Sequence, residues 1–390
     1  MPAEVDMPTF DSEDAARIRV VPVRQVITDR PFASVAKETA AIHDAFFDDM
    51  RPLVARFPTA RLREVTVVRA PDLDARVDAS GQTRVWYAIE SLQQTGSFKV
   101  RGALVAIDAC IKRAGTGAGL HVVAASAGNH GAAMAYAAAV LGVRATIFVP
   151  KGAPAAKCER IASLGADLRF GPTPHYDDAE AVAIAMAEAE RLPFISPFND
   201  LNVIAGNGGS LGYELARVLG HVPEHVLLPF GGGGLATGVA WALADAAGES
   251  PGQVSRVWGV QSDVSPVMAD ALERGEAIER FIPQGPSLAD GLSGGIPADA
   301  FVRARSAIGG VLVVSESAIA QAMHYIYRDL GLLVEGSSAA ALAPLLLSRE
   351  RVASALCVRG GDLVVLLTGR NVDRSTWERA VEPFAAVTNR

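Results

Sequence analysis

The feature that most constrains the fold of this chain is an alternation of short apolar segments with helical segments. Apolar segments at His121–Ala125, Ala145–Val149 and Ala166–Phe170 are each followed by a segment with a helical pattern. These helical segments are residues 129–141, 154–164 and 177–191. Parallel strands require a crossover connection, which is usually a helix. The alternation therefore predicts a parallel sheet covered by helices.

The same alternation resumes near residue 207. Predicted helices are 207–219, 235–246, 316–329 and 337–347, and predicted strands are 226–229, 257–260 and 363–367. Earlier in the chain, 65–70 and 84–89 are predicted to form either a strand pair or two separate strands of a sheet, and 102–112 a helix. We expect an α/β protein with two α/β units, one inserted into the other. The predicted division is a lead-in at 1–62, a larger domain at 63–120 and 199–390, and a smaller inserted domain at 121–198.

The predicted lead-in is irregular and charged, apart from one amphipathic helix that carries Val35, Ile42, Ala45 and Phe46 on one face. No role for this helix follows from the sequence.

Composition and charge exclude several classes of partner. The 390 residues include 36 basic and 43 acidic side chains, which are interspersed along the chain. The sequence has no basic face of the kind that binds nucleic acid and no polybasic run of the kind that binds a membrane surface. A small ligand is therefore expected. Cys110, Cys158 and Cys357 are too few for a disulfide framework or a zinc site, which fits a reducing compartment. With no secretory signal and no apolar stretch long enough to span a bilayer, a cytoplasmic protein is expected.

A run of four glycines is the strongest purely physical signal of a binding site. Gly231, Gly232, Gly233 and Gly234 follow the apolar segment 226–230, and a predicted helix begins at Leu235. Glycines allow backbone amides to approach an anion closely, and the amino terminus of a helix favours negative charge. The run predicts a phosphate site, and the alternative is a flexible turn without a ligand. It is not a nucleotide P-loop, because no Gly-Lys-Ser or Gly-Lys-Thr follows.

A second strand-to-helix turn reads Ser126-Ala127-Gly128-Asn129-His130-Gly131. Its backbone amides are suited to a carboxylate, and the Asn129 carboxamide is suited to a ring or carbonyl oxygen. The alternative is a helix cap formed by Ser126 or Asn129. An isolated histidine is more often structural than catalytic, so His130 is given no catalytic role.

Two further side chains complete the candidate site. Thr368 follows the apolar strand 363–367, at the end of a strand where open α/β sheets bind their ligands. Its hydroxyl is suited to a neutral heterocyclic nitrogen, although strand-ending turns are also common. Lys99 lies between a turn and a predicted helix, and the alternative for it is a solvated surface lysine. Together, the lysine, the glycine run, the turn and Thr368 match the needs of an aldehyde cofactor with a phosphate and a pyridine ring.

Five motifs carry a resemblance to a known family, and they occur in the family's order. They are Thr-Gly-Ser-Phe-Lys-Val-Arg-Gly, Ser-Ala-Gly-Asn-His-Gly, Gly-Gly-Gly-Gly-Leu, Leu-Val-Glu-Gly-Ser-Ser-Ala and Thr-Gly-Arg-Asn-Val-Asp. The chain resembles the serine/threonine dehydratase and serine racemase branch of the tryptophan synthase β-type (fold type II) pyridoxal-phosphate enzymes. The resemblance covers about residues 90 to 373.

The resemblance implies a fold, a cofactor and a set of site residues. The implied fold is two three-layer α/β domains with mostly parallel sheets, and the implied assembly is a homodimer. Lys99 would bind pyridoxal 5'-phosphate covalently and then move the substrate α-proton. The other implied cofactor contacts are Phe98 at the ring, Asn129 at the phenolic oxygen, Gly231–Gly234 and Leu235 at the phosphate, and Thr368 at the pyridine nitrogen. The implied substrate contacts are Ser126, Ala127, Gly128, Asn129 and His130, with Glu335 near the site and Ser126 also counted as catalytic.

The implied activity is that of an ammonia-lyase. A β-hydroxy or other β-substituted amino acid, such as serine or threonine, would give a 2-oxo acid and ammonia through an aminoacrylate. Ala127 stands where racemases of the family carry a second serine, which favours elimination over racemisation. β-Replacement, racemisation and a catalytically silent binding protein are the alternatives.

Two other positions depart from the family pattern. Gln261 replaces an acidic cation ligand of many relatives, and only Asp263 could substitute for it, so no metal is expected. Arg370 replaces a glycine, and it is either a surface residue or a selector for a substrate with a second acid group.

Overall fold

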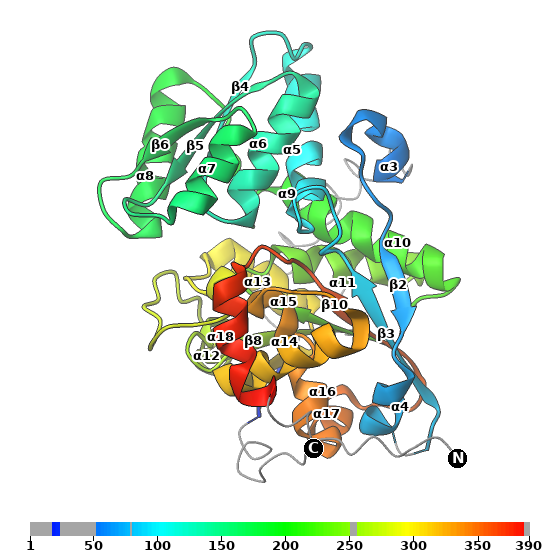
Figure 1. Cartoon of the computed structure of the whole chain (residues 1–390). Coiled ribbons are helices and arrows are strands. Elements are labelled where there is room, and N and C mark those ends of the chain that lie inside the picture. Colours follow the sequence, from blue (N-terminus) through cyan, green and yellow to red (C-terminus); the bar gives the residue numbers. More distant parts are fainter. Residues whose placement is uncertain (1–17, 24–51, 79, 250–255, 386–390) are drawn as a thin grey trace.

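The computed structural model describes residues 18–23, 52–78, 80–249 and 256–385 (Figure 1). The predicted amphipathic helix around residues 35–46 lies outside these residues. Within these residues, ten strands form two sheets, a seven-stranded sheet of order β1-β9-β8-β7-β10-β3-β2 and a three-stranded sheet of order β4-β5-β6. The strands are β1 (Arg19–Pro22), β2 (Thr66–Arg69), β3 (Thr83–Ile89), β4 (His121–Ala125), β5 (Arg144–Val149), β6 (Asp167–Phe170), β7 (His225–Pro229), β8 (Val257–Ser262), β9 (Gly310–Val314) and β10 (Gly361–Leu367).

The α-helices that connect and cover these strands follow in chain order. They are α3 (Leu53–Arg56), α4 (Pro71–Val77), α5 (Lys99–Ala114), α6 (Asn129–Leu141), α7 (Ala155–Ser163), α8 (Tyr176–Glu190), α9 (Leu201–Ile204), α10 (Ser210–Leu219), α11 (Gly234–Ala246), α12 (Val267–Arg274), α13 (Ala298–Ala307), α14 (Glu316–Leu330), α15 (Gly336–Ala339), α16 (Ala343–Leu347), α17 (Arg349–Leu356) and α18 (Arg374–Ala385). A π-helical turn, Ala205–Gly209, joins α9 to α10.

The seven-stranded sheet is the middle layer of three. Along β10, Leu363, Val365 and Leu367 belong to one apolar cluster, whereas Val364 and Leu366 belong to another. Because side chains alternate across a strand, the two clusters lie on opposite faces. One face packs against α14 to α16 and the other against α10 to α13. The sheet is parallel except at its two edges, where β1 pairs antiparallel with β9 and β2 pairs antiparallel with β3.

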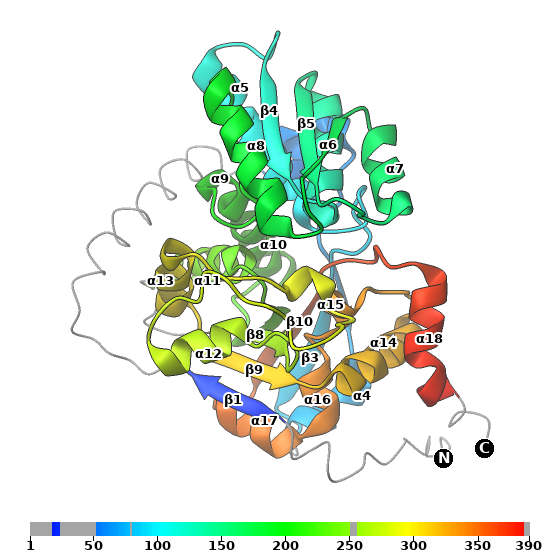
Figure 2. The same ribbon diagram turned by 90° about the vertical axis from the view of Figure 1, so that its left-hand side faces the viewer.

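The three-stranded sheet is wholly parallel and is also covered on both faces. Apolar residues of α6 and α7 pack on one face, and those of α8 pack with Val123, Ala125 and Phe148 on the other. In both views this unit lies above the larger sheet (Figures 1 and 2). The predicted fold class of two three-layer, mostly parallel α/β units is confirmed.

Two predictions need correction, and one strand was missed. The lead-in is not irregular throughout, because β1 pairs with β9 along one edge of the larger sheet. The predicted helix 337–347 is wrong, because two short helices occupy this stretch and Pro344 lies at the start of the second. Proline lacks the N–H that a helix interior needs, so it favours a new helix start. The strand Gly310–Val314 was not predicted at all.

Helix α5 begins at Lys99, three residues earlier than predicted, and packs against α6. Val100, Leu104 and Ile107 of α5 share an apolar cluster with residues of β4 and β5. Packing therefore joins α5 to the smaller sheet, although the predicted division assigns it to the larger domain. The domain boundaries stay a prediction. Among the described residues, none of the helices combines the length and the apolar character that a membrane-spanning segment needs.

Candidate active site

The lysine motif and the Thr368 motif are joined by backbone hydrogen bonds. The N–H of Phe98 donates to the carbonyl oxygen of Thr368 at 3.0 Å, and Ser97 forms an isolated antiparallel bridge with Gly369. Thr368 is 2% exposed and directly follows β10, the strand between β7 and β3. The fold thus places Lys99 at the carboxyl end of a central parallel strand, where ligands bind in such sheets.

Lys99 is half-buried, and its amine has few polar contacts. Its Nζ donates to the carbonyl oxygen of Pro197 at 3.1 Å and lies 5.1 Å from the centroid of the Phe98 ring. Burial lowers the pKa of Lys99 to about 8, and the negative charge of Glu335 opposes this shift. A large fraction of the amine is therefore neutral near pH 8, as a nucleophile or a proton acceptor must be.

Buried Glu335 and half-buried Asn129 and Asn371 form a polar cluster near Lys99. Asn129 Nδ2 donates to Glu335 Oε1 at 2.8 Å, and Asn371 donates its backbone N–H to Glu335 Oε2 at 3.1 Å. The side chain of Asn371 donates in turn to Asn129 Oδ1 at 2.5 Å. Burial raises the pKa of Glu335 to about 7, with a further contribution from Asp290, whereas the two asparagine contacts lower it. Glu335 is therefore a carboxyl group that exchanges a proton near neutral pH.

The turn from Ser126 to Gly131 is closed by its own residues. Ser126 Oγ accepts a hydrogen bond from the Gly128 N–H at 3.1 Å. A Cβ on Gly131 would lie 2.1 Å from the carbonyl oxygen of Ser126, so only glycine fits there. The capping alternative is wrong for this helix, since the residue before α6 is Gly128 and no side chain caps it. The turn leaves Ser126, Ala127 and Asn129 half-buried at the head of α6.

His130 is 3% exposed and is neutral at ordinary pH. Its Nε2 donates to the carbonyl oxygen of Ile195 at 3.2 Å, and its Nδ1 has no hydrogen-bond partner in the described structure. Burial, and then the positive charge of Lys99, lower the pKa of His130 to about 3. Such an imidazole does not serve as a general acid, which agrees with leaving it out of the catalytic residues.

The four-glycine run forms the loop between β7 and α11, as predicted. Gly233 has a positive φ of 86°, which favours glycine, and α11 begins at Gly234. A Cβ on Gly232 would lie 2.4 Å from Cγ of Phe198, so the Phe198 ring lies directly on the loop. Leu235 is 9% exposed, in the first turn of α11. Free amides at a helix start, with no room for side chains, suit a phosphate group.

Segment 197–198 belongs to the site, although no local pattern in the sequence indicated it. Pro197 accepts the hydrogen bond of Lys99, and Phe198 covers the glycine loop, so this segment lies between the two. Asp200 fixes it by capping α9, with its side chain accepting from the N–H groups of Asn202 and Val203. In the sequence, Asp200 ahead of the apolar residues Val203 and Ile204 indicates the start of a helix. This signal does not indicate which residues Phe198 contacts.

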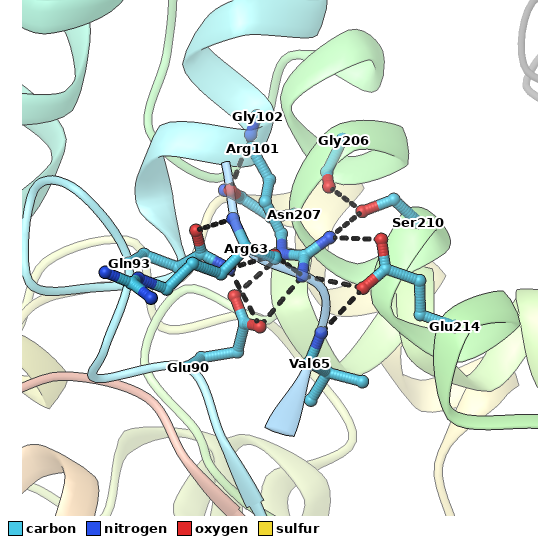
Figure 3. A network of polar contacts seen from close by, with 10 residues as sticks. All are labelled: Arg63, Val65, Glu90, Gln93, Arg101, Gly102, Gly206, Asn207, Ser210 and Glu214. Atoms are coloured by element: carbon cyan, nitrogen blue, oxygen red, sulfur yellow. Dashed lines mark hydrogen bonds and ion pairs between the residues drawn. The ribbon is translucent and has the colours of Figure 1, made fainter. Parts of the chain in front are cut away.

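The helix that carries Lys99 is anchored by a buried ionic network (Figure 3). Arg101, which is 1% exposed, binds both oxygens of Glu90 at 2.7 and 2.8 Å and both oxygens of Glu214 at 2.9 and 2.8 Å. Glu90 follows β3 and Glu214 lies on α10, so Arg101 ties α5 to the larger sheet and its covering helix. Burial raises the pKa of Glu90 and Arg101 opposes this shift.

Gln261 has no capacity left for a cation. Its Oε1 accepts from the N–H groups of Met268 and Ala269 at 3.0 and 3.1 Å, and its Nε2 donates to the carbonyl oxygen of Phe230 at 3.3 Å. The side chain thus joins β8 to α12. Among the residues that the structure describes, no group of three or more His, Cys, Asp or Glu side chains could hold a metal ion.

Comparisons with known proteins agree on one family. A family model described as pyridoxal-phosphate dependent enzyme matches residues 61–369. An L-threonine ammonia-lyase of Thermotoga maritima is 35% identical over 298 residues, which are 76% of this chain and 69% of that protein. The processed form of threonine deaminase isoform 2 from Solanum lycopersicum has a TM-score of 0.74 and 25% identity, and covers 93% of this chain and 98% of its own. Maize serine racemase has a TM-score of 0.73 and 25% identity, and the match covers 91% of this chain and 98% of the racemase chain.

Proposed function

Because the chain belongs to the family of pyridoxal-phosphate-dependent enzymes, we propose that it is an ammonia-lyase of the dehydratase type. It converts a β-hydroxy or other β-substituted amino acid, such as serine or threonine, into a 2-oxo acid and ammonia. A 35% identical relative described as an L-threonine ammonia-lyase supports this reaction class. The observation that carries the proposal is Lys99, whose pKa is lowered to about 8 beside a buried carboxyl group.

The residues of the site fit pyridoxal 5'-phosphate. The loop Gly231–Gly234 offers backbone amides for its phosphate, and Lys99 offers an amine for its aldehyde. Thr368, at the end of β10, offers a neutral hydroxyl for its ring nitrogen, and Phe98 lies against Lys99 to border the ring. When bound, pyridoxal phosphate withdraws electrons from the α-carbon and lowers the barrier to removing its proton.

Different residues of the chain then bind the substrate and move its α-proton. The amides of the Ser126–Gly131 turn hold the substrate carboxylate, which fixes the α-carbon in front of Lys99. Lys99 Nζ takes the α-proton, because its lowered pKa leaves it partly neutral at physiological pH. The orientation of the Asn129 carboxamide is fixed by Glu335, to which its amide nitrogen donates. Departure of the β-substituent completes the elimination, and hydrolysis yields the 2-oxo acid and ammonia.

Ala127 supports elimination over racemisation. A racemase needs a proton donor on the face of the α-carbon opposite Lys99, and alanine has no proton to give. The alternative within the same chemistry is β-replacement, in which a second nucleophile takes the place of water. Cytoplasmic location and a homodimeric assembly are part of the proposal, as is the absence of a nucleic-acid or membrane partner.

A substrate panel tests the proposal. The purified enzyme with pyridoxal phosphate is incubated with serine, threonine and O-substituted serines, and the 2-oxo acid and ammonia are measured. Equal amounts of both products are expected, and Lys99→Ala should abolish them together with the borohydride-trapped cofactor adduct. Lys151→Ala, at an exposed lysine, is the control and should keep both. A new amino acid without 2-oxo acid indicates a synthase, and a change of stereochemistry without ammonia indicates a racemase.

A further inference from the structure

Two arginines from distant parts of the chain each donate a hydrogen bond to the turn before α5. Arg160, on α7, is half-buried; its Nη1 donates to Asn371 Oδ1 at 2.5 Å and its Nη2 to the carbonyl oxygen of Thr95 at 2.6 Å. Arg370 is exposed, and its backbone N–H donates to the carbonyl oxygen of Gly96 at 2.9 Å. Cγ of Arg370 lies 3.4 Å from the position that a Cβ on Gly96 would take.

Neither guanidinium group is neutralised by a carboxylate in contact with it. Among the described residues, Arg160 donates to neutral oxygens and neither arginine forms an ion pair. By contrast, Lys157 on the same helix pairs with Asp290 at 2.9 Å. Burial lowers the pKa of Arg160, the charge of Arg370 lowers it further, and Glu335 raises it. Exposed Arg370 thus adds a second positive charge near the half-buried Arg160, and an anion that contacts both would offset this repulsion.

The two arginines adjoin the turn that the proposed function assigns to the substrate. Asn371, which accepts from Arg160, donates to Asn129 Oδ1 at 2.5 Å, and Asn129 belongs to that turn. An anion between Arg160 and Arg370 would thus lie beside the α-carboxylate of the substrate. The cofactor phosphate does not explain this pair, because the glycine loop at 231–234 already provides for it.

We propose that Arg160 and Arg370 bind a second acid group of the substrate, so that the preferred substrate is a β-hydroxy amino acid with a β-carboxylate, 3-hydroxyaspartate. This inference rests on the proposed function and specifies its substrate class. A guanidinium group binds a carboxylate through two parallel N–H donors, which gives affinity and orientation together. Serine and threonine lack this carboxylate, so they leave the arginine pair without its anion.

The reaction of this substrate is balanced without a further reagent. The α-proton moves to Lys99, the bond between the β-carbon and the hydroxyl oxygen breaks, and the leaving hydroxyl group takes up one proton, which balances the α-proton removed, and departs as water. The resulting enamine becomes an imine, and addition of one water molecule releases ammonia and oxaloacetate. No oxidant or reductant takes part, so the chemistry is that of the proposed lyase.

The test compares two substrates in matched variants. The values of kcat/KM for 3-hydroxyaspartate and for serine are measured in the wild type, Arg370→Gln, Arg370→Gly and Arg160→Lys. We expect the wild type to prefer 3-hydroxyaspartate, and each variant to lower the ratio of the two values about tenfold or more, the effect of one charge-assisted hydrogen bond. Arg374→Gln is the control, since Arg374 is 84% exposed and pairs with Glu378, and it should keep the wild-type ratio.

The outcomes separate this inference from the proposed function. If the wild type acts on serine or threonine but no better on 3-hydroxyaspartate, the arginine pair does not select the substrate and the lyase proposal stands. If the variants lower both kcat/KM values equally, the arginines support the turn only and the inference is overturned. If the wild type forms no 2-oxo acid from any of these substrates, both proposals fall. The visible absorbance and the thermal midpoint of each variant show whether it has kept its fold. If one Arg370 variant has lost its fold, the substrate ratio of the other Arg370 variant is the test.

Discussion

The side-chain amide of Asn129 donates a hydrogen bond to Glu335 at 2.8 Å, which joins the turn after β4 to the loop before α15. This contact connects α6, which packs on the three-stranded sheet, to the loop before α15, which packs on the seven-stranded sheet, at one buried carboxyl group. Glu335 also influences Lys99, because its negative charge raises the pKa that burial lowers. The protonation of Glu335 therefore affects both the stability of the fold and the reactivity of the lysine.

Glu335 should make the fold less stable as the pH rises. Its pKa is about 7 in the folded protein, against a usual value of 4.5, so between these values the folded state holds a proton that the unfolded chain has released. The free energy of unfolding then falls as the pH rises through this window, by about 2 to 3 kcal/mol for this group. Glu335→Gln should remove that part of the pH dependence. Urea unfolding of the apo forms of the wild type and Glu335→Gln, at pH 5 and at pH 8, measures this difference. An equal change in the free energy of unfolding in both proteins would contradict the prediction.

Lys99 should react with an aldehyde at a lower pH than an ordinary lysine. Only the neutral amine forms an imine, and the pKa of about 8 makes half of Lys99 neutral at that pH. The pH profile of adduct formation between the apo-protein and pyridoxal phosphate, trapped with borohydride, should rise with a midpoint near 8. Glu335→Gln should shift this midpoint to lower pH, because it removes the charge that raises the pKa of Lys99. A midpoint near 10.5, the usual pKa of lysine, would argue against a perturbed amine.

The positions of the chemical groups could be predicted from the sequence because each lies at a strand-to-helix turn. His121–Ala125 is followed by Ser126 and α6, and β7 is followed by the glycine loop and α11. Both predicted strands and both predicted helices are present with nearly the same bounds. Parallel topology places each of these turns at the carboxyl edge of its own sheet, the turn after β4 in the three-stranded sheet and the glycine loop after β7 in the seven-stranded sheet. The family resemblance, the fold and the cofactor are confirmed by the comparisons, whereas the individual roles of the site residues stay predictions.

The remaining parts of the site depend on contacts that have no local signal. Phe198 covers Gly232, and Arg160 reaches Asn371, only because separate elements pack together. Strand β9 was missed because a five-residue apolar run cannot be told from a buried helical segment by its period. The strand β1 is only four residues long, and it is defined by its pairing with β9 rather than by its own pattern.

Gly232→Ala should weaken cofactor binding. The new Cβ would lie 2.4 Å from Cγ of Phe198, so either the ring or the glycine loop must move. Displaced amides no longer converge on a phosphate, and we expect at least a tenfold loss of affinity for pyridoxal phosphate, about 1.4 kcal/mol. Equilibrium titration of the apo-protein, followed by visible absorbance, gives the dissociation constant. Gly117→Ala is the matched control, since its Cβ would meet its nearest atom at an ordinary 3.6 Å; equal affinities in the two variants would show that the loop tolerates the methyl group.

Arg101→Met should destabilise the protein strongly, because it leaves the carboxylates of Glu90 and Glu214 buried without their cation. Loss of one partner of a buried ion pair typically costs about 3 to 5 kcal/mol. Arg217→Met is the control, since the pair of Arg217 with Glu64 is 50% and 45% exposed and such pairs contribute about 1 kcal/mol or less. Thermal midpoints of the two variants measure this difference.

The same variant also tests whether Arg101 positions the catalytic lysine. Arg101 follows Lys99 by two residues in the first turn of α5, so release of its anchor should move the lysine relative to Thr368. We expect Arg101→Lys, which keeps the charge but cannot bind both carboxylates through two parallel donors, to recover part of the stability. Its borohydride-trapped adduct should nevertheless form more slowly than in the wild type. An adduct rate equal to that of the wild type, with stability still lowered, would limit Arg101 to holding the two layers together.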